Sequence, residues 1–131
     1  MPDISQTPRT LWIGRAASGL VVIALLLDGA SQFLAPASIA AMMQETGFDM
    51  ALTPALGSIM LGCAILYALP ATRFLGAILV TGFLGGAICA HFRLGEIGSA
   101  PQIASLLLGA LTWGGLYLRD PRLHPLLPLT R

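Results

Sequence analysis

Four long apolar segments, separated by shorter links, dominate the pattern of hydrophobic and polar positions. Their approximate bounds are residues 11–34, 52–69, 74–92 and 101–118. A helix needs roughly 20 apolar residues to cross a bilayer core about 30 Å thick. Prolines stand near the segment ends, as expected for a residue that disrupts helix interiors, and the runs lack the alternation of membrane β-strands. The pattern therefore predicts an all-α, polytopic membrane protein, a bundle of four transmembrane helices.

The link between the first two segments reads "PASIAAMMQETGFDM" and is long enough for a short helix. Its leading residue, Pro36, suits a first helical turn, and Gly47 suits a C-terminal cap. Ile39, Met42 and Met43 would share one face of such a helix, which would place it in the outer interface of the membrane. An irregular loop is the alternative.

Composition agrees with a membrane protein. Of the 131 residues, 56% are hydrophobic and 10% are charged, whereas a soluble domain carries about a quarter charged residues. Lysine is absent, and seven arginines against six acids give a net charge of +1. This balance provides no basic face for nucleic acid, so no nucleic-acid partner is expected. No linker-like segment divides the chain, and residues 1–131 are predicted to form a single domain.

The first segment has an alternative interpretation as a signal peptide. Residues 16–27 would be its apolar core and "ASIA" its cleavage site. Asp28 fits poorly beside such a core, and the segment is long enough to span the membrane. An intact-mass measurement would distinguish the two.

The arginines predict how the chain is oriented. All but Arg93 lie in the N-terminal flank, the link between the second and third segments, or the tail, namely Arg9, Arg15, Arg73, Arg119, Arg122 and Arg131. Because basic residues collect on the cytoplasmic side, we expect both termini in the cytoplasm. Interfacial aromatic residues are expected on that same side, namely Trp12, Tyr67, Trp113 and Tyr117.

One acid interrupts the first apolar segment, in "GLVVIALLLDGASQFL". With the orientation above, Asp28 lies about 9 Å below the outer end of its helix. The other polar residues inside the segments gather at the same depth. Ser31 and Gln32 follow on the same helical face, His91 and Arg93 end the third segment, and Ser58, Gln102 and Ser105 begin the second and fourth. The sequence thus predicts a polar cluster near the outer surface, in which these residues are the candidate site.

A membrane-embedded carboxylate needs a cation, a proton or trapped water. On the third segment Gly82, Gly86 and Arg93 share one face, and a GxxxG pair permits close helix approach. Arg93 is therefore the first predicted partner of Asp28, and His91 is the second. Ordinary headgroup contacts for both basic residues are the alternative.

Three stretches together resemble the DoxX-like family of small bacterial membrane proteins. They are "DGASQFLAP" at 28–36, "LYALPATRFLGAILVTGFLGGAICAHFR" at 66–93 and "GLYLRDPRLHPLLPL" at 115–129. The resemblance implies a four-helix bundle in a bacterial inner membrane, with Asp28, His91 and Arg93 at the family's polar positions. The family takes its name from proteins linked to quinone-dependent oxidation of sulfur compounds, and other relatives are associated with oxidative-stress complexes. Relatives often carry an acid where this chain has Met60.

Three functions follow as hypotheses. The first is a subunit or small enzyme of a quinone-linked redox system, in which Asp28 and His91 exchange protons and Arg93 holds an anionic group. The second is a non-catalytic partner that assembles or anchors another membrane protein. The third is a small-solute transporter, which would require the chain to form a homo-oligomer.

Built-in redox machinery is not expected. Clamping a haem between two histidines requires two intramembrane histidines, whereas His124 lies in the tail. Cys63 and Cys89 are too far apart in depth to form a disulfide, and neither iron–sulfur nor metal-ligand spacing is present. Electrons would come from a bound quinone or a redox partner.

Overall fold

The computed structural model describes residues 7–34 and 36–126, and within these ranges the regular elements are all helices. The long helices are α1 (Pro8–Leu34), α3 (Thr53–Ala68), α4 (Arg73–Arg93) and α5 (Ala100–Arg119). The shorter elements are α2 (Pro36–Thr46) and the 3-10 turns η1 (Met50–Leu52) and η2 (Pro121–Leu123). The predicted all-α fold is confirmed, and each predicted segment corresponds to one long helix.

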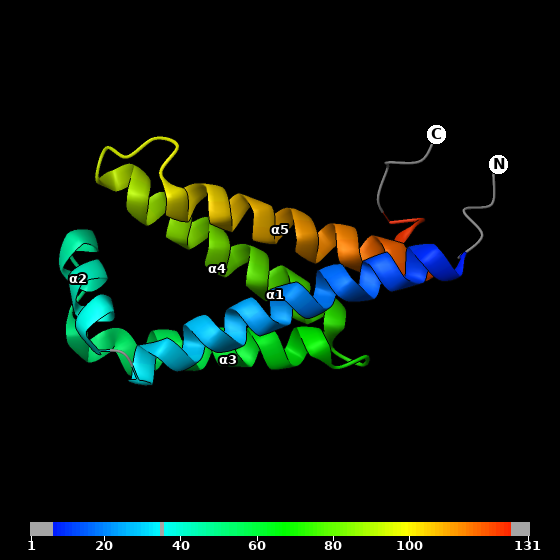
Figure 1. Ribbon diagram of the computed structural model, residues 1–131, viewed down its shortest axis with the longest axis horizontal. Coiled ribbons are helices and arrows are strands. Elements are labelled where there is room, and N and C mark those ends of the chain that lie inside the picture. The colour runs from blue at the N-terminus through cyan, green and yellow to red at the C-terminus, as the bar shows by residue number, and fades with distance from the viewer. Residues whose placement is uncertain (1–6, 35, 127–131) are drawn as a thin grey trace.

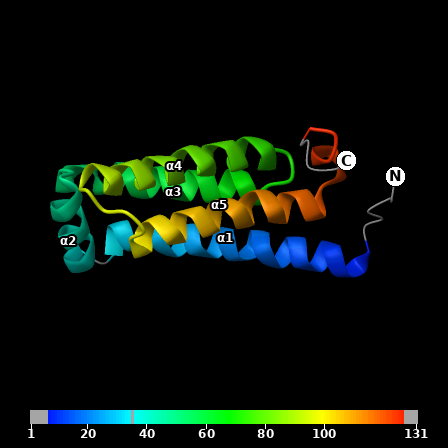
Figure 2. The ribbon, with the colours of Figure 1, turned by 90° about the horizontal axis from the view of Figure 1, so that it is seen from above.

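The four long helices lie side by side (Figure 1). α1 packs against α3 and α5, and α4 packs against the same two helices, so α1 and α4 occupy opposite corners of the bundle. α2 lies across one end, while the beginning of α1 and the end of α5 meet at the other (Figures 1 and 2). The core between the helices contains Val21, Leu25, Tyr67, Val80 and Leu116, each at most 2% exposed.

Within residues 7–34 and 36–126, three helical stretches are long and apolar enough to cross a membrane. They are Pro8–Leu34, Met50–Ala68 and Arg73–Arg93. α5 is the fourth member of the bundle but is not among these three stretches. The apolar surface of the bundle, on which large side chains such as Trp12, Leu20 and Ile78 are more than half exposed, is the surface expected of a membrane protein.

The link after α1 is helical, so the predicted short helix is confirmed. Gly47 adopts a φ of 75°, a left-handed conformation that favours glycine, and ends α2. The backbone N–H of Phe48 then donates to the carbonyl of Met43 over 3.0 Å, as in a Schellman cap. Met43 is 1% exposed, because this face of α2 packs against the end of the bundle rather than lying free in the interface.

Glycines set the closest helix contacts, but not where the sequence predicted them. A Cβ atom on Gly14 of α1 would lie 2.9 Å from the carbonyl oxygen of Gly115 on α5. One on Gly76 of α4 would lie 2.2 Å from the backbone nitrogen of Tyr67. Cβ atoms on Gly82 and Gly86 would meet nothing within 4 Å, so the predicted close approach of that GxxxG face is wrong.

Tyr67 is fully buried rather than interfacial. Its hydroxyl donates to the carbonyl of Thr112 over 2.8 Å and lies 3.0 Å from the hydroxyl oxygen of Ser18. Because a buried hydroxyl requires hydrogen-bond partners, these contacts fasten α3 to α1 and α5 in the half of the bundle that holds the termini.

Candidate functional site

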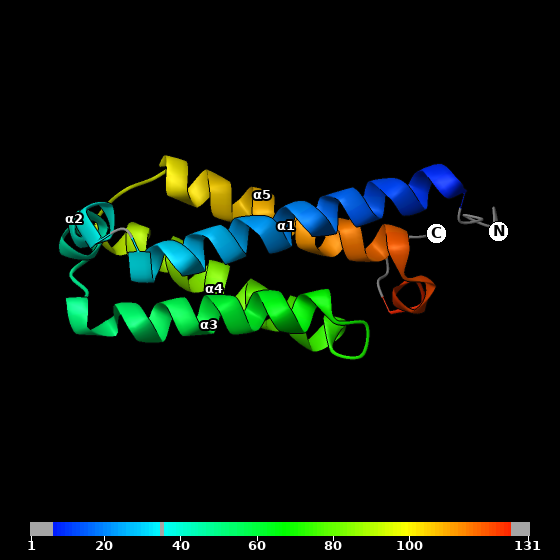
Figure 3. The ribbon, with the colours of Figure 1, turned by 60° about the horizontal axis from the view of Figure 1, so that its bottom comes forward.

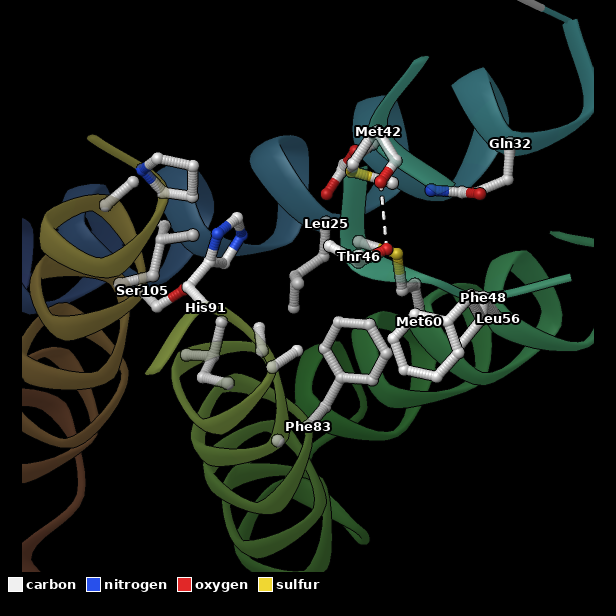
Figure 4. A pocket seen from close by; sticks show the side chains of 18 of the residues that line it. Leu25, Gln32, Met42, Thr46, Phe48, Leu56, Met60, Phe83, His91 and Ser105 are labelled. Carbon is white, nitrogen blue, oxygen red and sulfur yellow. Dashed lines mark hydrogen bonds between the residues drawn. The ribbon is translucent and has the colours of Figure 1, made fainter. Parts of the chain in front are cut away.

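A cavity of about 420 Å³ opens in the bundle beneath α2 (Figure 4). All five α-helices contribute to its lining. Its walls are mainly apolar and include Leu25, Leu56, Met60, Phe83 and Leu108. The packed core, with Val80 and Tyr67, lies between this cavity and the end that holds the termini.

Several polar side chains line this otherwise apolar space. They are Asp28, Gln32, Thr46, His91 and Ser105. Gln32 and Ser105 are each 8% exposed, and the Oε1 atom of Gln32 is buried without a hydrogen-bond partner among the residues that the structure describes. The structure therefore brings four of the predicted site residues, from α1, α4 and α5, to one cavity. A buried acceptor that lacks a partner favours a ligand with a hydroxyl or N–H group.

His91 is oriented by an acid from the loop after α4. Its Nδ1 lies 2.6 Å from Oε2 of Glu96, a contact that the positive φ of Gly95 (79°) helps to form by turning the chain back. Because a carboxylate accepts hydrogen bonds, Nδ1 carries the hydrogen and Nε2 of the neutral ring is left as an acceptor. His91 can therefore accept a hydrogen bond or a proton on Nε2 while Glu96 holds the ring.

Asp28 lies at the mouth of the cavity, since it lines this space and is also exposed at the surface. Pro101 and Ala104 of α5 share both properties, so this mouth lies between α1 and α5, and Gly82 and Gly86 of α4 also line the cavity and are exposed. Helices α1 and α5 meet near Gly14 and Gly115 and diverge toward α2 (Figures 1 and 3). In a membrane this opening would face the bilayer.

The predicted ion pair between Asp28 and Arg93 is wrong. The Nη2 atom of Arg93 donates to the carbonyl of Thr46 at the C-terminal end of α2. Asp28 takes part in none of the salt bridges within residues 7–34 and 36–126, and its second predicted partner, His91, pairs with Glu96. The reason is topological: α1 and α4 stand at opposite corners, and α2 presents unpaired carbonyls that attract the guanidinium.

Three other predicted site residues do not line the cavity, and their side chains form hydrogen bonds with the backbone in or next to their own helices. The hydroxyls of Ser31 and Ser58 donate to the carbonyls of Asp28 and Pro54, each over 2.7 Å. The side-chain oxygen of Gln102 accepts from the backbone N–H of Gly98 over 2.8 Å and helps to begin α5. A ligand in the cavity would not contact them directly.

The sequence did not place α2 or the glycine face in the site. The side of the cavity toward α2 is lined by Met42, Thr46 and Phe48. On the α4 side, Gly82 and Gly86 have no side chains that would fill the space. The shared face of Met42 and Met43 was a usable signal, but it could not be distinguished from a face resting on lipid.

Comparison with known proteins places this arrangement in a family. A model of the DoxX-like family matches residues 16–115, which include every cavity-lining residue. The chain belongs to the DoxX-like family. Neither a curated protein nor a solved structure matches it. Together with its apolar helices, the match identifies this DoxX-like protein as a membrane protein.

Proposed function

We propose that this DoxX-like protein binds a lipid-soluble, quinone-like molecule in the cavity beneath α2. The observation that carries the proposal is the combination of an apolar space with a few convergent polar groups, the usual character of small-molecule sites. Its volume of about 420 Å³ lies within the roughly 300–1,000 Å³ typical of such sites. A flat ring bearing two oxygens matches both the apolar walls and the separated polar groups.

The polar residues suit the two ends of such a ring. The unpartnered Oε1 of Gln32 and the Nε2 of His91 are acceptors for the hydroxyl groups of the reduced quinol form, and Ser105 offers a donor to a quinone oxygen. A bound quinone supplies two-electron, two-proton chemistry, with electrons delivered by a separate redox protein. Asp28 and His91 would hold or release the accompanying protons, because a carboxyl group and an imidazole can each carry a proton and both side chains line the cavity. Arg93 takes no part in ligand binding, since its guanidinium donates a hydrogen bond to the carbonyl of Thr46.

We further propose that all four long helices cross a bacterial inner membrane, with both termini cytoplasmic. The described residues near the termini include five arginines and one acid, namely Arg9, Arg15, Arg73, Arg119, Arg122 and Asp120. The opposite end, around α2, has Arg93 against four acids, Asp28, Glu45, Asp49 and Glu96. This asymmetry follows the positive-inside rule and supports an orientation with the cavity in the outer half of the bilayer.

Ligand binding is favoured over the two other hypotheses. The glycine face that suggested helix–helix assembly also lines the cavity, through Gly82 and Gly86. The packed core around Tyr67 and Val80 argues against a solute path through the bundle. The lateral mouth between α1 and α5 instead suits a molecule that arrives from the bilayer.

Two glycines that follow one another on α4 provide a matched test. Gly86 lines the cavity and Gly85 does not, and a Cβ on either meets nothing within 4 Å. We expect Gly86→Leu to fill the cavity and weaken binding of a short-chain quinone at least about tenfold. Gly85→Leu should bind as the wild type does. Calorimetric titration of purified protein in detergent measures both, and equal affinities for the two variants would reject the proposal.

A further inference from the structure

A second cavity, of about 300 Å³, lies at the end of the bundle that holds the termini. Two arginines line it, Arg15 of α1 and Arg119 of α5. The remaining wall is mainly apolar and includes Val22, Ile23 and Ala68. Val22 and Ile23 follow Arg15 by seven and eight residues on the same helix, so the wall extends about 10–12 Å from the cationic end toward the middle of the bundle.

Arg119 contacts Tyr67 but has N–H groups without hydrogen-bond partners among the described residues. Its Nε and Nη2 atoms are buried without a hydrogen-bond partner in the part of the chain that the structure describes. The guanidinium carbon lies 5.3 Å from the ring centroid of Tyr67, within the range of a cation–π contact. Tyr67 is itself fixed by its hydrogen bonds to Thr112 and Ser18. Arg119 as a whole is partly exposed, and because buried N–H groups without partners are costly, this side chain favours an anionic partner.

Asp120, the acid that follows Arg119 in the sequence, is occupied by two other arginines. Arg73 and Arg122 both pair with Asp120, at 3.2 and 2.9 Å. Within residues 7–34 and 36–126 no salt bridge includes Arg15 or Arg119. The two guanidinium groups therefore lack an acidic counter-ion among the residues that the structure describes.

We propose that this cavity binds the phosphate of an anionic phospholipid. The planar fork of a guanidinium matches phosphate oxygens, and two forks around one cavity can hold one phosphodiester. The glycerol and the first acyl carbons would lie along Val22, Ile23 and Ala68. Basic pockets between membrane helices suit acidic headgroups, and the apolar wall favours a lipid over free phosphate.

The test is the affinity of the purified full-length chain, after delipidation in neutral detergent, for phosphatidylglycerol. We expect Arg15→Gln to weaken binding at least about tenfold, the loss expected for a charge-assisted hydrogen bond. Arg9→Gln removes the same charge from the same helix without touching the cavity, and should change the affinity less than about twofold. Phosphatidylcholine, whose headgroup carries a compensating ammonium, should bind more weakly than phosphatidylglycerol.

Arg119→Gln should have at least as large an effect, but it also removes the contact with Tyr67. Arg15 is exposed, so Arg15→Gln keeps the test valid even if the Arg119 variant fails to fold. Equal losses for Arg9→Gln and Arg15→Gln would overturn the site in favour of general surface attraction. Inorganic phosphate that displaced the lipid at the lipid's own concentration would overturn the lipid assignment and leave a soluble phosphate compound as the occupant.

Discussion

Asp120 organises the charged residues that follow α5. Its carboxylate accepts hydrogen bonds from Arg122 through Nε, at 3.1 Å, and Nη2, at 2.9 Å, and a third from Arg73 at 3.2 Å. The hydrogen bonds from Arg122 are the main reason that the pKa of Asp120 lies below its ordinary value, and the charge of Arg73 adds to the effect. A carboxyl group with a lowered pKa stabilises the fold only where it is ionised.

Asp120→Asn is therefore expected to lower stability in a pH-dependent way. Asparagine keeps the size and can still accept from the backbone N–H of Arg122, but it loses the charge. At pH 7 the loss should be about 1 kcal/mol, a modest value because Arg122 is mostly exposed. The stabilisation is complete above the unfolded pKa of about 3.9 and disappears as the pH falls through the lower folded pKa.

The measurement is thermal unfolding of both proteins in detergent between pH 7 and pH 2. The two melting temperatures should converge below about pH 4. A difference that stayed constant down to pH 2 would show that the lost charge does not account for the effect.

At the scale of helices, the sequence was sufficient to predict where each helix begins and ends. It was not sufficient to predict which helices pack against each other. Apolar length and proline positions predicted the long helices, and Gly47 predicted the end of α2, because these features act locally. Helical periodicity shows which residues share a face, but not which helix that face meets. The depth of Asp28 was therefore predictable, whereas its pairing with Arg93 depended on the order of helices around the bundle and was wrong.

Two glycines of α4 test how the helices pack. A Cβ on Gly76 would overlap the backbone of Tyr67, whereas one on Gly85 has open space. We expect Gly76→Ala to destabilise the protein by about 1–3 kcal/mol or more through overpacking. Gly85→Ala should be neutral, or stabilising by up to about 1 kcal/mol from helix propensity. Thermal unfolding in detergent compares them, and equal melting temperatures would contradict the close contact at Gly76.

At the scale of the whole molecule, the two ends differ in charge and in the kind of cavity that each contains. The end with the termini holds the arginine-rich surface and the proposed phosphate cavity, and the end beneath α2 holds the acids and the apolar cavity. Between them, the Tyr67 hydrogen bonds and the buried core join the helices. The two proposed sites lie at opposite ends of the bundle and can therefore operate independently.

The proposed membrane topology rests on this asymmetry in charge. In a cysteine-free background, Glu45→Cys on α2 should react with an impermeant maleimide in intact cells. Thr7→Cys, just before α1, and Leu126→Cys, after α5, should react only after permeabilisation. Opposite reactivity would reverse the orientation. Labelling of Leu126→Cys from outside would show that α5 does not complete the fourth crossing.

Photochemical crosslinking with a membrane-soluble azidoquinone tests the central claim most directly, because peptide mapping shows where the molecule binds. We expect attachment to cavity residues such as Met42 and Phe83, lost in Gly86→Leu and retained in Gly85→Leu. Attachment spread over lipid-facing side chains such as Leu20 and Ile78, or unchanged by Gly86→Leu, would contradict a ligand site beneath α2.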